Sequence, residues 1–185
     1  TEGIWHPRHG LFTSLAEYRQ HLDPDRPTVG ITFPRSYWLE HNTAHIEALV
    51  TAVEELDANT VPFFCLRLPD ARRGNPGMAQ VLENLLRDDE GRCVVDTLVD
   101  VHGMSMTAGV PANADAYPNL GVSVLHALTS YAPRAAWQAT AQGMGSMDVA
   151  TQAAQPEFDG ALITKLLATR EVDEVDDLTG AVVPR

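Results

Sequence analysis

The feature that most constrains the fold is an alternation of two kinds of apolar pattern between residues 28 and 140. Compact apolar runs bounded by turn-forming residues predict buried strands, and segments with helical spacing of apolar residues separate them. The predicted strands are residues 28–33, 60–66, 93–101 and 122–126, with a fifth at 162–169. This alternation favours parallel pairing, because parallel neighbours need a long crossover connection, usually a helix.

The helical segments carry their own start signals. Over residues 43–56 the apolar side chains fall on one helix face, with Asn42 or Thr43 as the predicted cap. That face consists of Ile46, Leu49, Val50, Val53 and Leu56. A second helix is expected to start at Asn75 and Pro76. Its predicted buried stripe consists of Met78, Val81, Leu82, Leu85 and Leu86. Shorter helices are predicted over residues 15–22, 133–140 and 146–154.

Together these patterns predict an α/β fold of flavodoxin-like or Rossmann-like type, a mostly parallel sheet with helices on both faces. Residues 1–27 are expected to form an N-terminal arm with a short helix, residues 28–170 the α/β domain, and residues 171–185 an acidic tail or the start of a next segment. Pro156 is expected to end the last helix. Ligands of such folds meet the loops beyond the carboxyl ends of the strands, predicted here at residues 34–42, 69–75, 102–111 and 127–132.

The net charge narrows the class of partner, and the cysteine usage indicates the redox compartment. The 185 residues include 25 acidic side chains against 13 Lys and Arg, for a net charge of −12. Such a surface repels phosphate backbones and anionic lipid, so neither a nucleic acid nor a membrane is expected as partner. Two cysteines without a CxxC pair fit reduced thiols in a cytoplasmic protein. The start, Thr1 to Gly3, has no initiator Met, and we expect a piece of a longer polypeptide.

Familiar nucleotide-binding motifs do not occur in the sequence. Pro34, Arg35 and Ser36 fill the turn where a dinucleotide fingerprint would place glycines, which disfavours a Rossmann-type cofactor site. No Walker A motif occurs either, so any ATP must be bound by another chain or domain. Residues 103–107 (GMSMT) only approach the GxSxG elbow of hydrolases, because Thr107 replaces the second glycine.

Several polar side chains stand where a ligand would bind. Arg35, after the first predicted strand, could hold an anionic group or form a structural salt bridge. His102 ends the third predicted strand. It could be a ligand, a proton carrier or a hydrogen-bonded loop residue, and the same alternatives apply to His126 at the end of the fourth. His41 and His45 have the spacing of two metal ligands on a helix, although polar residues around a helix start explain them better.

An ordered set of short motifs resembles the large subunit of cobaltochelatase and the H subunit of magnesium chelatase. The motifs are WHP at 5–7, PTVGITFPRS at 27–36, HNT at 41–43, VPFF at 61–64, VHGMS at 101–105 and QPEFDG at 155–160. Their order and spacing agree over roughly residues 3–171. This sequence departs from the family pattern at His41, His102, Met104 and Gln155.

The resemblance implies a domain of an ATP-dependent, ligase-type chelatase that inserts Co²⁺ or Mg²⁺ into a tetrapyrrole in cobalamin or chlorophyll-type biosynthesis. The implied partners are AAA+ chelatase subunits, which would bind the ATP, and the remaining domains of a longer polypeptide, without which the chain is expected to be inactive. His102 and Glu157 are the expected catalytic residues, and His102 and His41 the expected metal contacts. The expected substrate-binding residues are Arg35, Ser36, His41, Asn42, Ser105 and Asp159.

Two other functions stay open. The domain could be a non-catalytic interaction module that docks the AAA+ subunits or other domains, in which case its exposed surfaces would matter more than the loop histidines. It could also be a small-molecule hydrolase with Ser105 as nucleophile, which would require an acid and a base not evident in the sequence.

Overall fold

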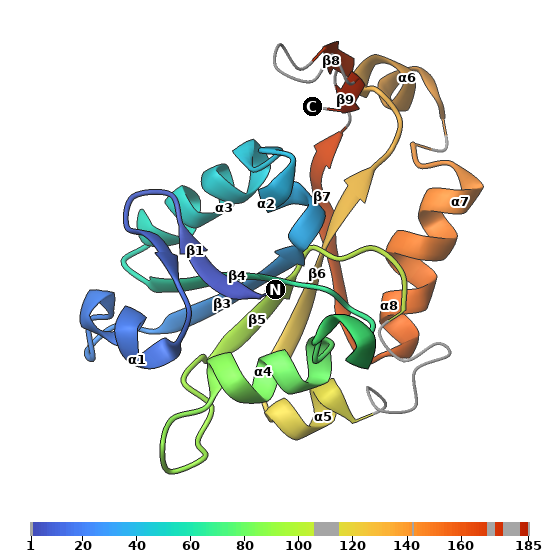
Figure 1. Ribbon diagram of the computed structural model, residues 1–185. Helices are drawn as coiled ribbons and strands as arrows, with labels where there is room; N and C mark the ends of the chain where they lie inside the picture. The colour runs from blue at the N-terminus through green and yellow to red at the C-terminus, as the bar shows by residue number, and fades with distance from the viewer. Residues whose placement is uncertain (1, 106–114, 142, 170–172, 176–181, 185) are drawn as a thin grey trace.

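A computed structural model describes residues 2–105, 115–141, 143–169, 173–175 and 182–184. It confirms the α/β class: a seven-stranded sheet carries helices on both faces (Figure 1). The strands of the large sheet are β1 (Gly3–His6), β2 (Gly10–Phe12), β3 (Thr28–Pro34), β4 (Asn59–Cys65), β5 (Thr97–Asp100), β6 (Ser123–Ser130) and β7 (Leu162–Thr169). Residues 173–175 (β8) and 182–184 (β9) pair as a separate antiparallel ribbon.

The strand order is β2-β1-β4-β3-β5-β6-β7, and all neighbours from β4 to β7 are parallel. Numbered along the chain, the five parallel strands follow the order 2-1-3-4-5 of flavodoxin-like sheets. The hairpin β1–β2 was not expected from the sequence. It extends the sheet because β1 pairs antiparallel with β4, bringing Ile4 beside Phe63, and Ile4 is fully buried. Two strands of three and four residues are too short to leave a clear alternating pattern.

Eight helical elements or helix segments lie between the described strands. They are α1 (Leu15–Tyr18), α2 (Arg35–Leu39), α3 (Ala44–Glu54), α4 (Met78–Leu86), α5 (Ala116–Leu120), α6 (Arg134–Ala139), α7 (Ser146–Asp148) and α8 (Gln155–Phe158). Single 3₁₀ turns follow at Arg19–His21 (η1) and Ala71–Arg73 (η2), and a π-helical turn, η4, spans Val149–Ala154.

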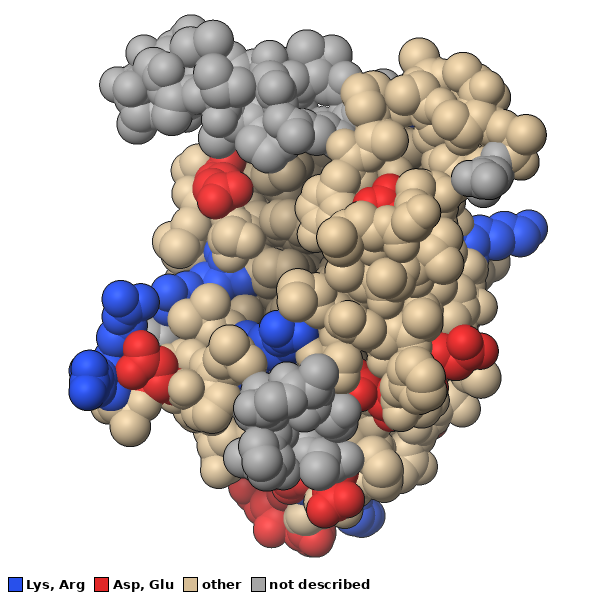
Figure 2. All heavy atoms as spheres, turned by 90° about the vertical axis from the view of Figure 1, so that its right-hand side faces the viewer, with Lys and Arg blue, Asp and Glu red and all other residues tan. Residues whose placement is uncertain are grey.

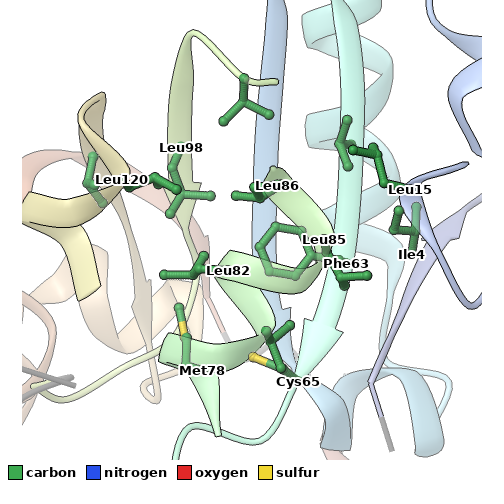
Figure 3. Close-up of a cluster of buried hydrophobic side chains, with 14 of the residues drawn as sticks. Ile4, Leu15, Phe63, Cys65, Met78, Leu82, Leu85, Leu86, Leu98 and Leu120 are labelled. Carbon is green, nitrogen blue, oxygen red and sulfur yellow. The ribbon is translucent and has the colours of Figure 1, made fainter. Parts of the chain in front are cut away.

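Apolar side chains fill both faces of the sheet, since successive residues of a strand point to opposite sides. Against one face lie α1, α4 and α5, and Figure 3 shows this cluster. The predicted stripe of α4 is confirmed: Met78, Val81, Leu82, Leu85 and Leu86 are all buried. Each such side chain stabilises the fold by roughly 1.5–3 kcal/mol. The opposite face is covered by α2 and α3, with Ile31, Phe33, Ile46 and Val50 at its centre.

Several predicted boundaries are wrong. Helix α3 ends at Glu54, so Leu56 is 82% exposed rather than part of the buried face. Thr43 precedes α3, but its hydroxyl donates to the Glu47 carboxylate instead of accepting from the helix amides. Gly77, at a φ of 77°, takes the cap position of α4 that was expected at Asn75. The stretch 34–42 is not an irregular loop throughout, because it contains α2.

The segment from Ser146 to Phe158 is one continuous helical run through α7, η4 and α8. Pro156 does not end it, contrary to expectation. Pro156 stands in the first turn of α8, directly after the π-helical turn, where the wider coil frees it from the usual i−4 hydrogen bond. Both cysteines are free thiols, as expected. Among the described residues no helix is long and apolar enough to cross a membrane.

Candidate functional site

The topological switch point lies between β3 and β5. The chain leaves β3 towards β4 and leaves β5 towards β6, so the loops after these two strands diverge at the carboxyl edge of the sheet, which is where ligands of such folds bind. The sequence predicted ligand contacts at this edge. The structure places α2 after β3 and the segment 101–105 after β5.

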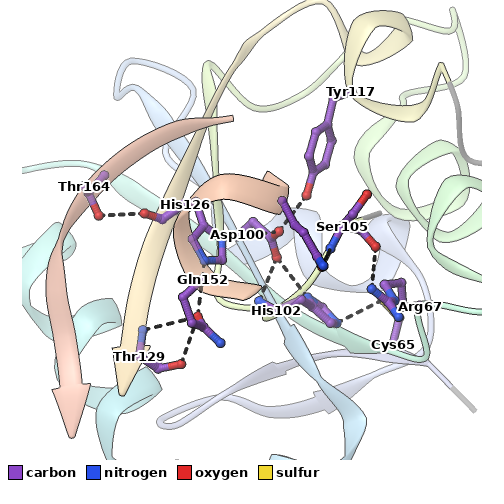
Figure 4. Close-up of polar contacts among 11 residues, drawn as sticks. Cys65, Arg67, Asp100, His102, Ser105, Tyr117, His126, Thr129, Gln152 and Thr164 are labelled. Carbon is purple, nitrogen blue, oxygen red and sulfur yellow. Dashed lines mark hydrogen bonds and ion pairs between the residues drawn. The ribbon is translucent and has the colours of Figure 1, made fainter. Parts of the chain in front are cut away.

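Asp100, the last residue of β5, organises the polar side chains at this edge (Figure 4). One carboxylate oxygen accepts from the backbone N–H of His102 at 2.8 Å and lies 2.9 Å from the Nδ1 of the same residue. The other accepts from the Tyr117 hydroxyl at 2.6 Å and lies 3.8 Å from His126 Nδ1. All four residues are buried. The two-residue loop back to the His102 amide fixes the direction in which the chain leaves the strand.

Burial and ionic contacts shift the pKa values of His102 and Asp100 in opposite directions. Burial lowers the pKa of His102, but the hydrogen bonds to Asp100 and Cys65 outweigh it and raise this pKa to about 10. Burial raises the pKa of Asp100, yet the hydrogen bond from His102 and the neighbouring His126 ring bring it below its ordinary value. Burial, with the negative Asp100, raises the pKa of Tyr117. At neutral pH the network is therefore a buried imidazolium–carboxylate pair with a neutral phenol.

Cys65 stands at the other side of His102. Its sulfur lies 3.9 Å from His102 Nε2 and 4.0 Å from the Thr32 hydroxyl. Both ring nitrogens of His102 thus face protein groups, and only 4% of the residue is exposed. The arrangement fits the expectation of a hydrogen-bonded loop residue, which the sequence had left open.

A second group of contacts ties the segment after β5 to distant elements. The Ser105 hydroxyl donates to Asp159 at 2.8 Å, and its backbone N–H donates to the Gln155 side chain at 3.0 Å. The Arg67 guanidinium donates to the Ser105 carbonyl. Ser105 and Asp159, both predicted as site residues, are therefore brought together although 54 residues separate them. Because the Ser105 hydroxyl is bonded to a carboxylate rather than to an imidazole, the geometry does not support the hypothesis that Ser105 is the nucleophile of a hydrolase.

A third group centres on Gln152 in the π-helical turn. Its side-chain oxygen accepts from the Thr129 hydroxyl at 3.2 Å, from the Thr129 backbone N–H at 3.4 Å and from His126 Nε2 at 3.3 Å. His126 does not end its strand as predicted. It lies within β6, opposite Asp100 in the register, and is fully buried.

The remaining predicted residues lie on α2, just beyond it, or on α8. Arg35 and Ser36 begin α2, and His41 and Asn42 follow its end, where His41 adopts a left-handed φ of 55°. Helical spacing therefore does not apply between His41 and His45, whose pKa burial lowers to about 4. Glu157 is exposed on α8. Within the described part of the chain, no group of three metal-ligand side chains converges.

Reasoning from the sequence missed several residues that build the site: Asp100, Arg67, Tyr117, Gln152 and Gln155. The one available signal was Asp100, an acid enclosed by the apolar strand residues Leu98, Val99 and Val101. A carboxylate in such a run is rarely buried without partners. The other four stand in segments whose contacts depend on the strand order.

Basic side chains gather in the loops at this edge. Four arginines follow β3 and β4, namely Arg35, Arg67, Arg72 and Arg73. Figure 2 shows basic side chains across the middle of one face and a group of acidic side chains at its lower end. In a chain of net charge −12, the loops after β3 and β4 thus carry a local group of arginines, whose guanidinium groups suit an anionic ligand group.

The model of the family described as CobN/Magnesium Chelatase matches residues 1–184. The aerobic cobaltochelatase subunit CobN of a Sinorhizobium species is 27% identical over 184 residues, which cover 94% of this chain and 14% of that protein. The magnesium-chelatase H subunit of Rhodobacter capsulatus is 27% identical over 179 residues, which cover 91% of this chain and 14% of that protein.

A solved structure agrees with these relatives. The catalytic subunit of cobaltochelatase from Mycobacterium tuberculosis superposes with a TM-score of 0.59 at 29% identity, over 80% of this chain and 12% of that one. The chain therefore spans about one seventh of the length of the curated relatives described above. The resemblance inferred from the ordered motifs is confirmed, and the chain belongs to the CobN/magnesium chelatase family.

Proposed function

We propose that this chain is a domain of the large subunit of a ligase-type chelatase, which inserts Co²⁺ or Mg²⁺ into a tetrapyrrole using ATP hydrolysed by AAA+ partner subunits. The observation that carries the proposal is the buried network around Asp100 at the switch point, in a chain of this family. The network fixes the carboxyl edge rigidly, as a wall of a binding cavity requires. The metal and the tetrapyrrole are the substrates, and the rest of the cavity would come from other domains of the polypeptide.

In this proposal the basic side chains at this edge receive the acidic or amide side chains of the tetrapyrrole. Arg35 begins α2 at this edge, with Ser36 next to it and Asn42 just beyond the helix. A guanidinium can hold a carboxylate through two parallel hydrogen bonds, which would orient the macrocycle. Ser105 and Asp159, bonded to each other at 2.8 Å, would form the facing rim.

Insertion also needs bases for two pyrrole protons and ligands that replace water on the metal. Glu157 is exposed and could accept a proton, while the exposed His41 could meet the hydrated metal ion. His102 is buried between Asp100 and Cys65, so we propose that it supports the segment after β5 and does not contact the metal.

The test uses the full-length polypeptide with its AAA+ subunits, ATP, Co²⁺ or Mg²⁺ and a metal-free tetrapyrrole, with insertion followed by the absorption spectrum. We expect Arg35→Ala to weaken tetrapyrrole binding by about tenfold or more, the loss of a charge-assisted hydrogen bond. The matched control is Arg19→Ala in the 3₁₀ turn η1, remote from the carboxyl edge. Unchanged binding and insertion in Arg35→Ala would remove this residue from the proposed site, and no insertion by the wild type with either metal would refute the function.

An additional docking role is favoured by three strongly exposed apolar side chains near the end of the described chain. Phe158 is 89% exposed, Met147 71% and Leu162 60%, on α8, α7 and β7. Because the curated relatives are about seven times longer, we propose that other domains of the same polypeptide cover these side chains. Capture of AAA+ subunits by this chain without tetrapyrrole binding would instead support the interaction-module function.

A further inference from the structure

Gln152 is held in one orientation by the three hydrogen bonds to its side-chain oxygen. The Thr129 backbone N–H can only donate, so the atom that faces it at 3.4 Å must be the oxygen of the amide. The Thr129 hydroxyl and His126 Nε2 complete the set on the same side. The amide nitrogen of Gln152 consequently points in the opposite direction, towards the segment after β5.

That nitrogen has no hydrogen-bond acceptor among the described residues, although Gln152 is only 1% exposed. Leaving a buried donor unpaired costs about 1–3 kcal/mol, and such groups are uncommon in native proteins. Gln152 also belongs to η4, a π-helical turn, and π-turns are frequent at functional sites. An unpaired donor on an irregular turn is therefore a candidate ligand contact.

Gly103 packs directly against this donor. A methyl group built on Gly103 would lie 2.2 Å from the Gln152 nitrogen and 3.6 Å from the Tyr131 hydroxyl oxygen. The backbone of Gly103 is not in the left-handed region that demands glycine. Its lack of a side chain therefore makes room for the Gln152 amide group and is not required by the backbone conformation.

We propose that the Gln152 amide nitrogen, with Gly103 as floor and the Tyr131 hydroxyl beside it, binds a carboxylate or carboxamide oxygen of the small molecule held at the carboxyl edge. The site is a donor that lacks an acceptor, so it selects an oxygen acceptor and rejects an alkyl group. It rests on the proposed function, in which a tetrapyrrole side chain supplies that oxygen. Through His126, which bonds Gln152 and lies 3.8 Å from Asp100, the contact also adjoins the buried network.

Two variants test the contact in different ways. Gln152→Glu keeps the oxygen that accepts the three hydrogen bonds but replaces the donor by an acceptor. Gly103→Ala keeps the chemistry of Gln152 but places a methyl group 2.2 Å from its nitrogen, so the donor must leave its position. The controls make the same chemical changes elsewhere: Gln138→Glu on the exposed side of α6, and Gly145→Ala, where an added methyl group meets nothing within 4 Å.

The probe is coproporphyrin, a metal-free porphyrin with carboxylate side chains, titrated into the full-length polypeptide by fluorescence quenching. We expect both test variants to bind it at least about tenfold more weakly than the wild type, and both controls to bind within about twofold. Binding of an alkyl-substituted porphyrin in detergent should not distinguish Gln152→Glu from the wild type. Coproporphyrin binding by both test variants at wild-type strength would overturn the proposal.

A second measurement separates this contact from the function on which it rests. In protein labelled with ¹⁵N-glutamine, the side-chain amide signal of residue 152 is identified by its loss in Gln152→Glu. We expect sodium acetate to shift that signal in the wild type and not in Gly103→Ala. If the wild type binds no porphyrin but shows this shift, the tetrapyrrole function fails and the oxygen-acceptor site stands. An unmoved signal at saturating acetate would refute the site.

Discussion

Replacing Asp100 by Asn tests the buried ion pair at the centre of the site. Asn keeps the shape of the side chain and one carbonyl oxygen for the His102 backbone N–H, but it removes the negative charge. The Tyr117 hydroxyl, which donates to the second carboxylate oxygen at 2.6 Å, would then face an amide N–H. The change therefore strips the His102 imidazolium of its counter-charge and disturbs a second buried donor.

The structure sets the size of the effect. Asp100 is 1% exposed and His102 4% exposed, so solvent screens their attraction little. Removing one partner of such a buried pair costs about 3–5 kcal/mol. The contacts of His102 with Asp100 and with Cys65 together outweigh its burial and raise its pKa from 6.5 to about 10, which agrees in direction with a stabilising pair. We expect Asp100→Asn to lower the free energy of unfolding by about 3–5 kcal/mol at pH 6.

Urea unfolding, followed by circular dichroism between pH 5 and pH 10, measures this. His102 has a raised pKa in the folded state, so its stabilisation is fully present below about pH 6.5 and is lost as the pH rises towards 10. Asp100 has a lowered pKa, and its contribution is lost only below the ordinary pKa of Asp, about 3.9. The loss caused by Asp100→Asn should therefore be largest near pH 5–6 and should shrink on the alkaline side.

The control is Asp89→Asn, the same chemical change at an exposed position. It should alter the free energy of unfolding by less than about 0.5 kcal/mol. A loss below about 1 kcal/mol for Asp100→Asn, or one that grows from pH 6 to pH 9, would refute the assignment of a buried imidazolium–carboxylate pair.

Two further changes probe the scaffold around the site. Glu54→Ala removes the acceptor of the buried His6 ring at 2.9 Å, which should loosen the hairpin β1–β2 and cost about 1–3 kcal/mol of unfolding free energy in urea; Glu55→Ala, next to it and exposed, should be nearly neutral. Gly30→Ala places a methyl group 3.1 Å from Leu98 in the core, so we expect a loss of about 1–3 kcal/mol and a lower Tm in thermal unfolding.

The sequence alone determined the fold class and the family. Residues 28–33 and 60–66 read as strands, and the stripe from Met78 to Leu86 as a buried helix face, because apolar periodicity is a local property that burial imposes on the chain. The ordered motifs from residue 5 to residue 160 indicated the family, because each motif is also a local pattern. Local patterns could not predict that Ser105 bonds to Asp159, although both residues were expected at the site.

The tertiary structure alone decided which strand ends meet. Asp100 and His126 lie side by side because β5 pairs with β6, and Cys65 meets His102 across the end of β3, which lies between β4 and β5. The strand order cannot be predicted from any local pattern, because the order depends on how the helices on both faces pack to exclude water from the whole sheet. Once that order is set, buried charges must find partners in the neighbouring strands and loops, and this requirement assembles the site.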